Sequence, residues 1–188
     1  MNKKEDILRT TIELYQIKGD SISLDDISSK IGCSKTLILY YFNNRSALLS
    51  ACFCQICREL KLALDQVIAP EEISKSSMRM YLTELWRAYF NYLKDNPSKA
   101  KFFIQYSHRY EPPPPGYIAP EAAIKKILDE RYDKIVEGDE ELLFEIKYMI
   151  AIANGMAALV FSQTTDVPED VTEKCIELIM NGLSMDDL

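Results

Sequence analysis

The sequence LDDISSKIGCSKTLILYYFNNRSALL, residues 24–49, decides how the N-terminal part of this chain folds. Its first eight residues carry apolar side chains at helical spacing, which predicts a short amphipathic helix. Gly32 follows, and a residue without a Cβ atom most readily ends a helix in the left-handed conformation. Ser34 then offers a hydroxyl that caps a second helix over residues 35–42. Two short helices joined by a tight turn are typical of a helix-turn-helix, whose second helix fits the major groove of DNA.

The rest of the chain also reads as helical, because apolar residues recur at helical spacing and no segment alternates as a strand does. Residues 112–116, four prolines and a glycine, cannot form a helix and predict a stiff extended spacer. We expect an all-α fold of about nine helices, over residues 3–18, 24–31, 35–42, 45–67, 74–96, 99–109, 120–136, 141–163 and 171–182.

The chain has 188 residues, enough for one domain or for a small domain joined to a larger one, and its net charge is −7. Residues 1–50 hold 7 Lys and Arg against 6 Asp and Glu, a net +1, whereas residues 51–188 hold 15 against 23, a net −8. Because an acidic body is repelled by DNA, docking on DNA would occur through the N-terminal end. No apolar signal segment follows Met1, and the run 149–161 is too short to span a bilayer, so we expect a cytoplasmic protein.

The N-terminal pattern resembles that of TetR-family transcriptional regulators over roughly residues 5–50, and the resemblance is architectural beyond that range. The matching positions are Ile7-Leu8, Gly19, Asp26-Ile27, Gly32-Cys33-Ser34, Tyr41-Phe42, Arg45 and Leu48-Leu49. The resemblance implies a three-helix DNA-binding domain over residues 1–46 and a larger helical ligand-binding and dimerisation domain over residues 47–188. The chain departs from the family at Leu37-Ile38-Leu39, where Thr-Leu-Tyr is usual, which implies weaker or differently distributed phosphate contacts.

We expect the second helix of the helix-turn-helix and its flanks to contact DNA. Lys35 can donate to guanine O6 or N7, and Thr36 can donate, accept or pack against a thymine methyl group. Tyr41 and Arg45 are better placed as phosphate anchors. The alternative is that Lys35 and Thr36 are only solvated residues of a first helical turn. The full candidate set is Ser34, Lys35, Thr36, Leu37, Tyr40, Tyr41 and Arg45.

Aromatic residues are concentrated on the predicted helices 74–96 and 99–109 and just beyond them. A pocket lined by aromatic rings and a few phenol groups suits a mid-sized apolar or aromatic molecule. The same residues would also form an ordinary helical core, which is the commoner explanation for any one of them. The candidate ligand-binding residues are Trp86, Tyr89, Phe90, Phe103, Tyr106, His108 and Tyr110.

The last two predicted helices carry small and apolar residues that allow close contact between helices. The resemblance implies that these helices form a four-helix interface in a homodimer. Two recognition helices would then face half-sites about one helical turn apart, roughly 34–36 Å. The candidate interface residues are Ile150, Asn154, Ala157, Phe161, Cys175, Leu178, Ile179 and Gly182.

Five cysteines are present, and three of them form the pattern Cys52-x-Cys54-x-x-Cys57. In a reducing cytoplasm they are free thiols, most simply buried as small apolar residues, and a thiol or metal sensor is the alternative. His108 is the only histidine, which leaves little for Ser-His or Cys-His catalysis, and no glycine-rich phosphate loop is present. We therefore expect that the protein is not an enzyme and that it binds no cofactor and no metal ion.

These patterns together favour a ligand-responsive DNA-binding regulator. Its simplest form is a repressor that binds a near-palindromic operator as a homodimer and is released by a small, largely apolar or aromatic effector. A ligand-independent DNA binder or activator is one alternative. The other is a helical protein-interaction module that has lost DNA binding, which the apolar residues Leu37 and Leu39 keep open.

Overall fold

The computed structural model describes residues 2–67, 75–107, 140–161 and 170–181. These residues contain eight α-helices, one short 3₁₀ helix and no strand, which confirms the all-α prediction. None of the described helices combines the length and the hydropathy that a membrane crossing needs. The helices are α1 (Lys3–Lys18), the 3₁₀ helix η1 (Gly19–Ser21), α2 (Leu24–Ile31), α3 (Lys35–Phe42), α4 (Arg45–Asp65), α5 (Lys75–Asp95), α6 (Pro97–Ser107), α8 (Glu140–Phe161) and α9 (Val171–Asn181).

The predicted helix bounds agree with the structure to within two residues wherever the two can be compared. One of the two-residue differences is at the start of α6, which the sequence predicts at residue 99. This helix begins at Pro97, because the fixed φ of proline suits the first helical position and its missing N–H has no partner to lose there. The predicted helix 120–136 and the proline-rich spacer 112–116 lie outside the described residues.

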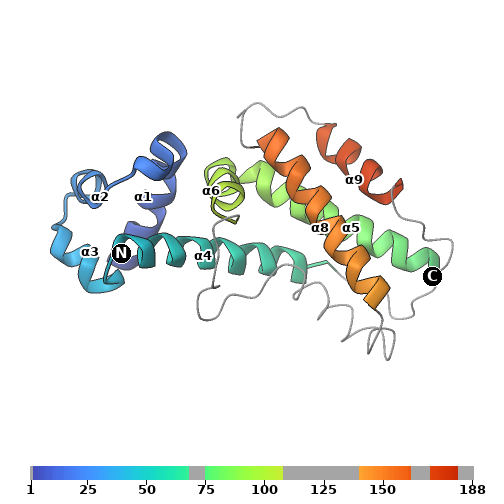
Figure 1. The fold of residues 1–188 in the computed structure, drawn as a ribbon, viewed down its shortest axis with the longest axis horizontal. Helices are drawn as coiled ribbons and strands as arrows, with labels where there is room; N and C mark the ends of the chain where they lie inside the picture. Colours follow the sequence, from blue (N-terminus) through green and yellow to red (C-terminus); the bar gives the residue numbers. More distant parts are fainter. Residues whose placement is uncertain (1, 68–74, 108–139, 162–169, 182–188) are drawn as a thin grey trace.

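The helices form two groups that α4 joins (Figure 1). Helices α1, α2 and α3 lie together at one end of the molecule, and we call residues 2–42 the head. Helices α5, α6, α8 and α9 form the body at the other end. Helix α4 leaves the head at Arg45 and continues along the body, so that one unbroken helix connects the two groups.

Local capping interactions set the bounds of the short helices in the head. The Ser23 hydroxyl accepts a hydrogen bond from the Asp26 backbone N–H at 3.2 Å, and the Asp26 carboxylate accepts one from the Ser23 backbone N–H at 2.8 Å. This reciprocal pair is a capping box in which Asp performs the usual role of Glu or Gln. Gly32 ends α2 with φ 69° and ψ 41°, the left-handed conformation that the sequence predicts.

The core of the head draws a side chain from each of its helices and from the start of α4. Ile7 of α1, Ile27 of α2, Ile38 of α3 and Leu48 of α4 are all fully buried. Four helices contributing to one core hold α3 at a fixed angle to α4. The orientation of the helix-turn-helix therefore depends on the position of α4.

Helix α6 packs against the head from the side of the body. The rings of Tyr15 on α1 and Phe102 on α6 lie 4.5 Å apart between centroids. The Lys101 ammonium donates to the Gln16 backbone carbonyl at 2.9 Å, and the Ser98 hydroxyl donates to the Gln16 side-chain oxygen at 2.5 Å. These contacts give the head a second attachment to the body besides α4.

Candidate nucleic-acid interface and internal cavity

Helix α3 buries one face in the head and presents the other to solvent. Ile38 and Phe42 are buried, whereas Lys35, Thr36 and Tyr40 are exposed, Tyr40 over 78% of its surface. The helix lies at the end of the molecule away from the body (Figure 1). A short helix exposed in this way has the size and the access that entry into a major groove requires.

The other predicted DNA-contact residues on this helix have more varied environments. Ser34 caps α3, because its hydroxyl accepts a hydrogen bond from the Leu37 backbone N–H at 3.2 Å. Leu37 itself is half-buried. Tyr41 is exposed beside Tyr40, and the two rings meet edge to face with centroids 5.4 Å apart. The surface that α3 offers is thus mostly aromatic and aliphatic, with Lys35 as its cation.

Arg45, which the sequence predicts to be a phosphate anchor, makes two hydrogen bonds inside the head. The side chain is half-buried, and its Nε donates to the Ile22 backbone carbonyl at 2.7 Å. A terminal guanidinium nitrogen donates to the Asp20 backbone carbonyl at 2.6 Å. Arg45 therefore braces the start of α4 against the connection between α1 and α2. The sequence could not reveal this role, because both acceptors are backbone atoms more than twenty residues away in the chain.

Acidic residues neutralise part of the positive charge on the head. The Lys35 ammonium lies 2.5 Å from an Asp25 carboxylate oxygen, and the Lys18 ammonium lies 2.5 Å from an Asp26 carboxylate oxygen. The hydrogen bond from Lys18, together with those from Ser23, lowers the pKa of Asp26 to about 2. The other exposed lysines of the head are Lys3, Lys4 and Lys30.

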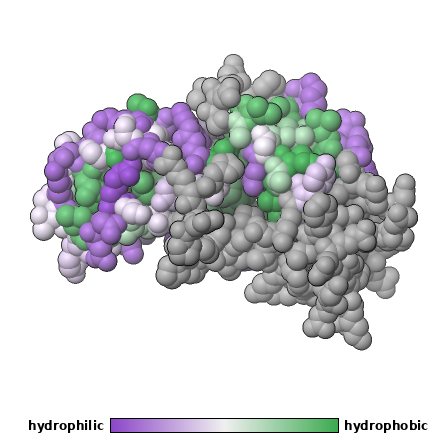
Figure 2. Space-filling model, viewed as in Figure 1, coloured by the Kyte–Doolittle hydropathy of each residue, from purple (hydrophilic) through white to green (hydrophobic). Residues whose placement is uncertain are grey.

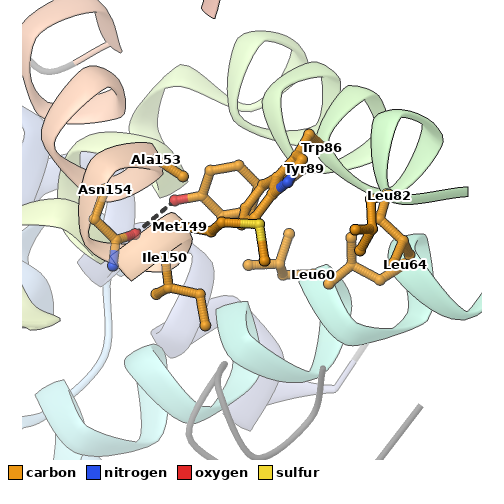
Figure 3. A pocket seen from close by; sticks show the side chains of 10 residues that line it. Leu60, Leu64, Leu82, Trp86, Tyr89, Met149, Ile150, Ala153 and Asn154 are labelled. Carbon is orange, nitrogen blue, oxygen red and sulfur yellow. Dashed lines mark hydrogen bonds between the residues drawn. The ribbon is translucent and has the colours of Figure 1, made fainter. Parts of the chain in front are cut away.

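An internal cavity of about 30 Å³ lies between α4, α5 and α8 (Figure 3). This volume holds roughly two water molecules, so the surrounding side chains fill most of the space. The lining is almost entirely hydrocarbon, with no charged side chain among the described residues that form it. Those residues are Leu60, Leu64, Leu82, Leu85, Trp86, Tyr89, Met149, Ile150, Ala153 and Asn154.

Three of the lining residues carry a polar side-chain group, although none of these groups exposes surface to the cavity. The Tyr89 hydroxyl donates to the Asn154 side-chain oxygen at 2.7 Å, as the dashed line in Figure 3 shows. Burial raises the pKa of Tyr89, so the phenol stays protonated and remains a donor. The third group is the Trp86 indole N–H, which is buried with no hydrogen-bond partner among the described residues. A buried donor left unpaired costs about 1–3 kcal/mol.

The structure brings only part of the predicted ligand-binding set to the cavity. Trp86 and Tyr89 line it, whereas Phe103 and Tyr106 pack on Phe53 of α4, with ring centroids 5.5 and 5.7 Å from the Phe53 ring. Phe90 is fully buried against Phe161, at 6.2 Å between ring centroids. The remaining two candidates, His108 and Tyr110, lie outside the described residues.

The cavity residues that sequence reasoning missed are mostly aliphatic. Leu60 and Leu64 on α4, and Leu82 and Leu85 on α5, follow the spacing of an ordinary apolar helix face. That spacing predicts burial but does not distinguish a cavity wall from a filled core. Only the gap left between three packed helices identifies these leucines as lining residues.

The arrangement of head, α4 and body is similar to that of several solved structures. PfmR, a TetR family transcriptional regulator from Thermus thermophilus, matches 95% of this chain and 98% of its own, with a TM-score of 0.62 and 18% identity. A tetR-family transcriptional regulator from Streptomyces coelicolor matches 94% of this chain and 76% of its own, with a TM-score of 0.64 and 18% identity. A TetR-like transcriptional regulator from Rhodococcus sp. RHA1 matches 96% and 94%, with a TM-score of 0.65 and 13% identity. The chain has the TetR fold.

The likeness lies in the fold, since no protein-family model and no curated protein matches the sequence. Within this TetR fold, most of the residues predicted for a dimer interface turn inward. Ile150, Ala157 and Phe161 of α8 and Cys175 and Ile179 of α9 are all buried inside the protomer. They contribute to the core of the protomer, and the interface predicted at these positions stays a prediction.

The other three residues predicted for the interface have three different environments. Asn154 bonds to Tyr89 within the protomer, Leu178 is exposed, and Gly182 lies outside the described residues. The outer face of α8 carries other apolar or small residues. These are Tyr148, Ala151, Gly155 and Leu159, of which Leu159 is 72% exposed. Figure 2 shows hydrophobic residues gathered over the part of the body that α8 covers.

Of the five cysteines in this chain, Cys52 and Cys175 are buried as small apolar side chains, whereas Cys33, Cys54 and Cys57 are half-buried. Cys52 is fully buried in the core between α4 and α1, and burial raises the pKa of Cys57 to about 12. Burial also raises the pKa of Cys54. Thiols with raised pKa values are poor nucleophiles and poor metal ligands at neutral pH. Among the described residues, no group of three or more His, Cys, Asp or Glu side chains could hold a metal ion.

Proposed function

We propose that this protein is a DNA-binding transcriptional regulator that reads DNA with α3. The observation that carries the proposal is the exposure of Lys35, Thr36 and Tyr40 on a capped helix that is anchored by Ile38 and Phe42. The likeness in fold to three transcriptional regulators supports it. The proposed DNA-binding domain is residues 1–46, and the proposed ligand-binding and dimerisation domain is residues 47–188.

The exposed side chains of α3 suit the chemistry of base edges. Lys35 would donate to guanine, while Thr36 and the exposed aliphatic Leu39 would pack against thymine methyl groups. Tyr40 would also face base edges. The Tyr41 hydroxyl, the part of Arg45 that stays exposed and the exposed lysines of the head would contact phosphates, which fix register without specifying sequence. With few unpaired cations available, we expect a shallower salt dependence than that of a strongly basic DNA-binding domain.

We further propose that the regulator is a homodimer assembled through the outer faces of α8 and α9. Gly155 and Ala151 would allow close approach of two α8 helices, and Leu159 and Leu178 would lose their exposed apolar surface. Such an arrangement would present two heads to the two halves of a near-palindromic operator.

The proposed regulation is release of DNA by a small effector that enters the cavity. Leu60 and Leu64 form one wall, and both belong to α4, the helix that also carries part of the head core through Leu48. An effector that displaces this wall would therefore reorient the head. A coupling of about 1–3 kcal/mol would weaken DNA binding roughly 5- to 150-fold, which is the behaviour of a repressor.

Selection of random duplex DNA by the purified full-length protein, at two salt concentrations, tests the DNA-binding proposal. We expect enrichment of a near-palindromic sequence, and the Lys35→Ala variant should lose preference at one base position in each half-site. If no sequence enriches at low salt, the protein is instead an interaction module that no longer reads DNA. If a sequence enriches but no apolar compound changes its affinity or the thermal stability of the protein, regulation by an effector is ruled out.

A further inference from the structure

A surface groove lies where the start of α1 packs against the first turns of α4 (Figure 1). Its volume is about 660 Å³, which is within the range of sites that hold mid-sized organic molecules. None of the described residues that line it belongs to α5 or α8, so the groove is separate from the internal cavity. It is a second candidate site, and its lining has a different chemistry.

The groove is positively charged in a protein that is acidic overall. Lys4 of α1 and Arg58 of α4 both line it, and no Asp or Glu stands among its described lining residues. The Lys4 ammonium lies 5.8 Å from the centroid of the Phe42 ring, a contact that leaves its charge uncompensated. Because the whole chain carries a net charge of −7, two cations without an acidic neighbour make this groove an exception, and their positive potential favours an anion.

Arg58 is the one arginine among the described residues that makes no hydrogen bond and no ion pair with any of them. The other four described arginines each have a partner: Arg9 bonds to Asp6, Arg45 to the Ile22 carbonyl, Arg79 to Asn181 and Arg87 to Glu173. No acidic residue stands three or four positions from Arg58 on α4 to pair with it. Its planar guanidinium is thus free to bind a carboxylate or phosphate group through two parallel hydrogen bonds.

The rest of the lining combines hydroxyl groups with apolar surface. Ser46 and Ser50 line the groove, and neither hydroxyl bonds to another described residue. The apolar surface includes Leu8, which is buried, and Ala51 and Cys54, which are half-buried. Apolar surface beside a free guanidinium suits a molecule that carries an anionic group on an apolar body.

We propose that this groove binds a small amphipathic anion. The carboxylate or phosphate group of the ligand pairs with the Arg58 guanidinium, and its apolar body rests on Leu8 and Ala51. The bound molecule contacts the head directly, through Lys4 and Leu8. A molecule in the internal cavity, by contrast, touches α4, α5 and α8 and reaches the head only through α4.

The DNA backbone is the other anion that Arg58 could meet, but the position of this residue favours the small molecule. Arg58 lies about 20 Å along α4 from Arg45, at 1.5 Å per residue. Helix α4 runs from the head towards the body, whereas α3 lies at the end of the molecule away from the body (Figure 1). A duplex that α3 enters therefore lies on the far side of the head from Arg58.

The inference is tested with three probes that share one aromatic body: 2-naphthoate, 2-naphthyl phosphate and 2-naphthamide. The first two carry the two candidate anionic groups, and the third is close in shape to the carboxylate but has no charge. Dissociation constants come from calorimetry on the full chain without DNA, so the test does not depend on the proposed function. The tighter of the two anions identifies which group the site prefers.

We expect at least one anion to bind up to about fivefold more tightly than 2-naphthamide, the preference that one exposed ion pair gives. The Arg58→Gln variant removes the charge and should lose this preference, and its melting temperature should not change because Arg58 bonds to no described residue. The matched control is Lys61→Gln, which removes a positive charge from the same helix outside the groove and breaks only an exposed pair with Asp65. Its affinity for the anions should stay that of the unmodified protein.

The inference is overturned if 2-naphthamide binds as tightly as both anions, or if neither anion binds at millimolar concentration. It is also overturned if Arg58→Gln keeps the preference for the anions, or if Lys61→Gln loses as much of it as Arg58→Gln does. A fourth result would assign Arg58 to the DNA backbone instead. In that case Arg58→Gln would bind every duplex more weakly, with a reduced salt dependence, and would bind 2-naphthoate as the unmodified protein does.

Discussion

Replacement of Arg45 by methionine separates a structural role for this residue from a role in phosphate binding. Methionine keeps most of the aliphatic length but removes the hydrogen bonds to the Ile22 carbonyl, at 2.7 Å, and to the Asp20 carbonyl, at 2.6 Å. A hydrogen bond from a charged donor contributes about 1.5–3 kcal/mol. The bond to Asp20 is exposed, so water replaces much of it, and we expect a total loss of about 2–3 kcal/mol.

A loss of this size lowers the melting temperature by roughly 4–12 °C for a chain of this length. Thermal unfolding followed by circular dichroism measures it. The Arg45→Lys variant keeps the positive charge but cannot hold both carbonyls with a planar fork, so its melting temperature should also fall. The matched control is Lys35→Ala on the neighbouring helix, which loses only an exposed ion pair with Asp25, so we expect a change of at most about 1 kcal/mol.

The reasoning is refuted by a specific combination of results. In that combination, Arg45→Met has the same melting temperature as the unmodified protein but binds every duplex more weakly. The slope of its DNA affinity against salt concentration, on logarithmic axes, is then smaller by about one. Arg45→Lys would then bind DNA normally. This outcome would return Arg45 to the role of a phosphate anchor and would make its two backbone bonds energetically unimportant.

Three further changes test the head and the body. The Asp25→Asn variant releases Lys35 from its ion pair, and an exposed pair contributes up to about 1 kcal/mol. DNA affinity measured by fluorescence anisotropy should therefore rise by up to about fivefold. Unchanged or weaker binding would contradict this prediction. The pKa of Asp26 is lowered from 3.8 to about 2, so its ionised form stabilises the fold above about pH 4 and this contribution is lost as the pH falls towards 2. The difference in melting temperature between the unmodified protein and Asp26→Asn should shrink over that interval, and a difference independent of pH would rule out the ionised carboxylate as its source. The Leu159→Glu variant would bury an unpaired charge in the proposed interface, so light scattering should show the mass of a single protomer. The control Leu62→Glu, at an exposed leucine of α4, should keep the mass of the dimer. Equal masses for both variants would exclude α8 as the interface.

Much of the fold could be predicted from the sequence, because helix ends depend on residues within one turn. Ser34 caps α3 through a backbone N–H three residues away, and Gly32 ends α2 through its own φ. The predicted DNA-contact residues Lys35, Thr36 and Tyr40 lie on the exposed side of α3, opposite the buried Ile38 and Phe42. These features require no knowledge of where the other helices lie.

The candidate sites depended more on tertiary packing. The second half of α8 is apolar or small on most of its surface, so the sequence could not say which side faces inward. Packing against α5, α6 and α9 buries Ile150 and Ala157 and leaves Leu159 exposed, which moves the candidate dimer surface to the other side of the helix.

The cavity and the role of Arg45 likewise depend on tertiary packing. The sequence placed aromatic side chains on neighbouring helices, but the gap that Trp86 and Tyr89 line exists only where α4, α5 and α8 meet. The partners of Arg45 are backbone carbonyls, which every residue possesses and no sequence pattern marks. The sequence by itself therefore determined the helices, their ends and the buried side of α3, because these follow from contacts within a few residues. Only the tertiary structure decided the inward side of α8, the cavity and the role of Arg45, because these depend on atoms that are distant in the chain and close in space.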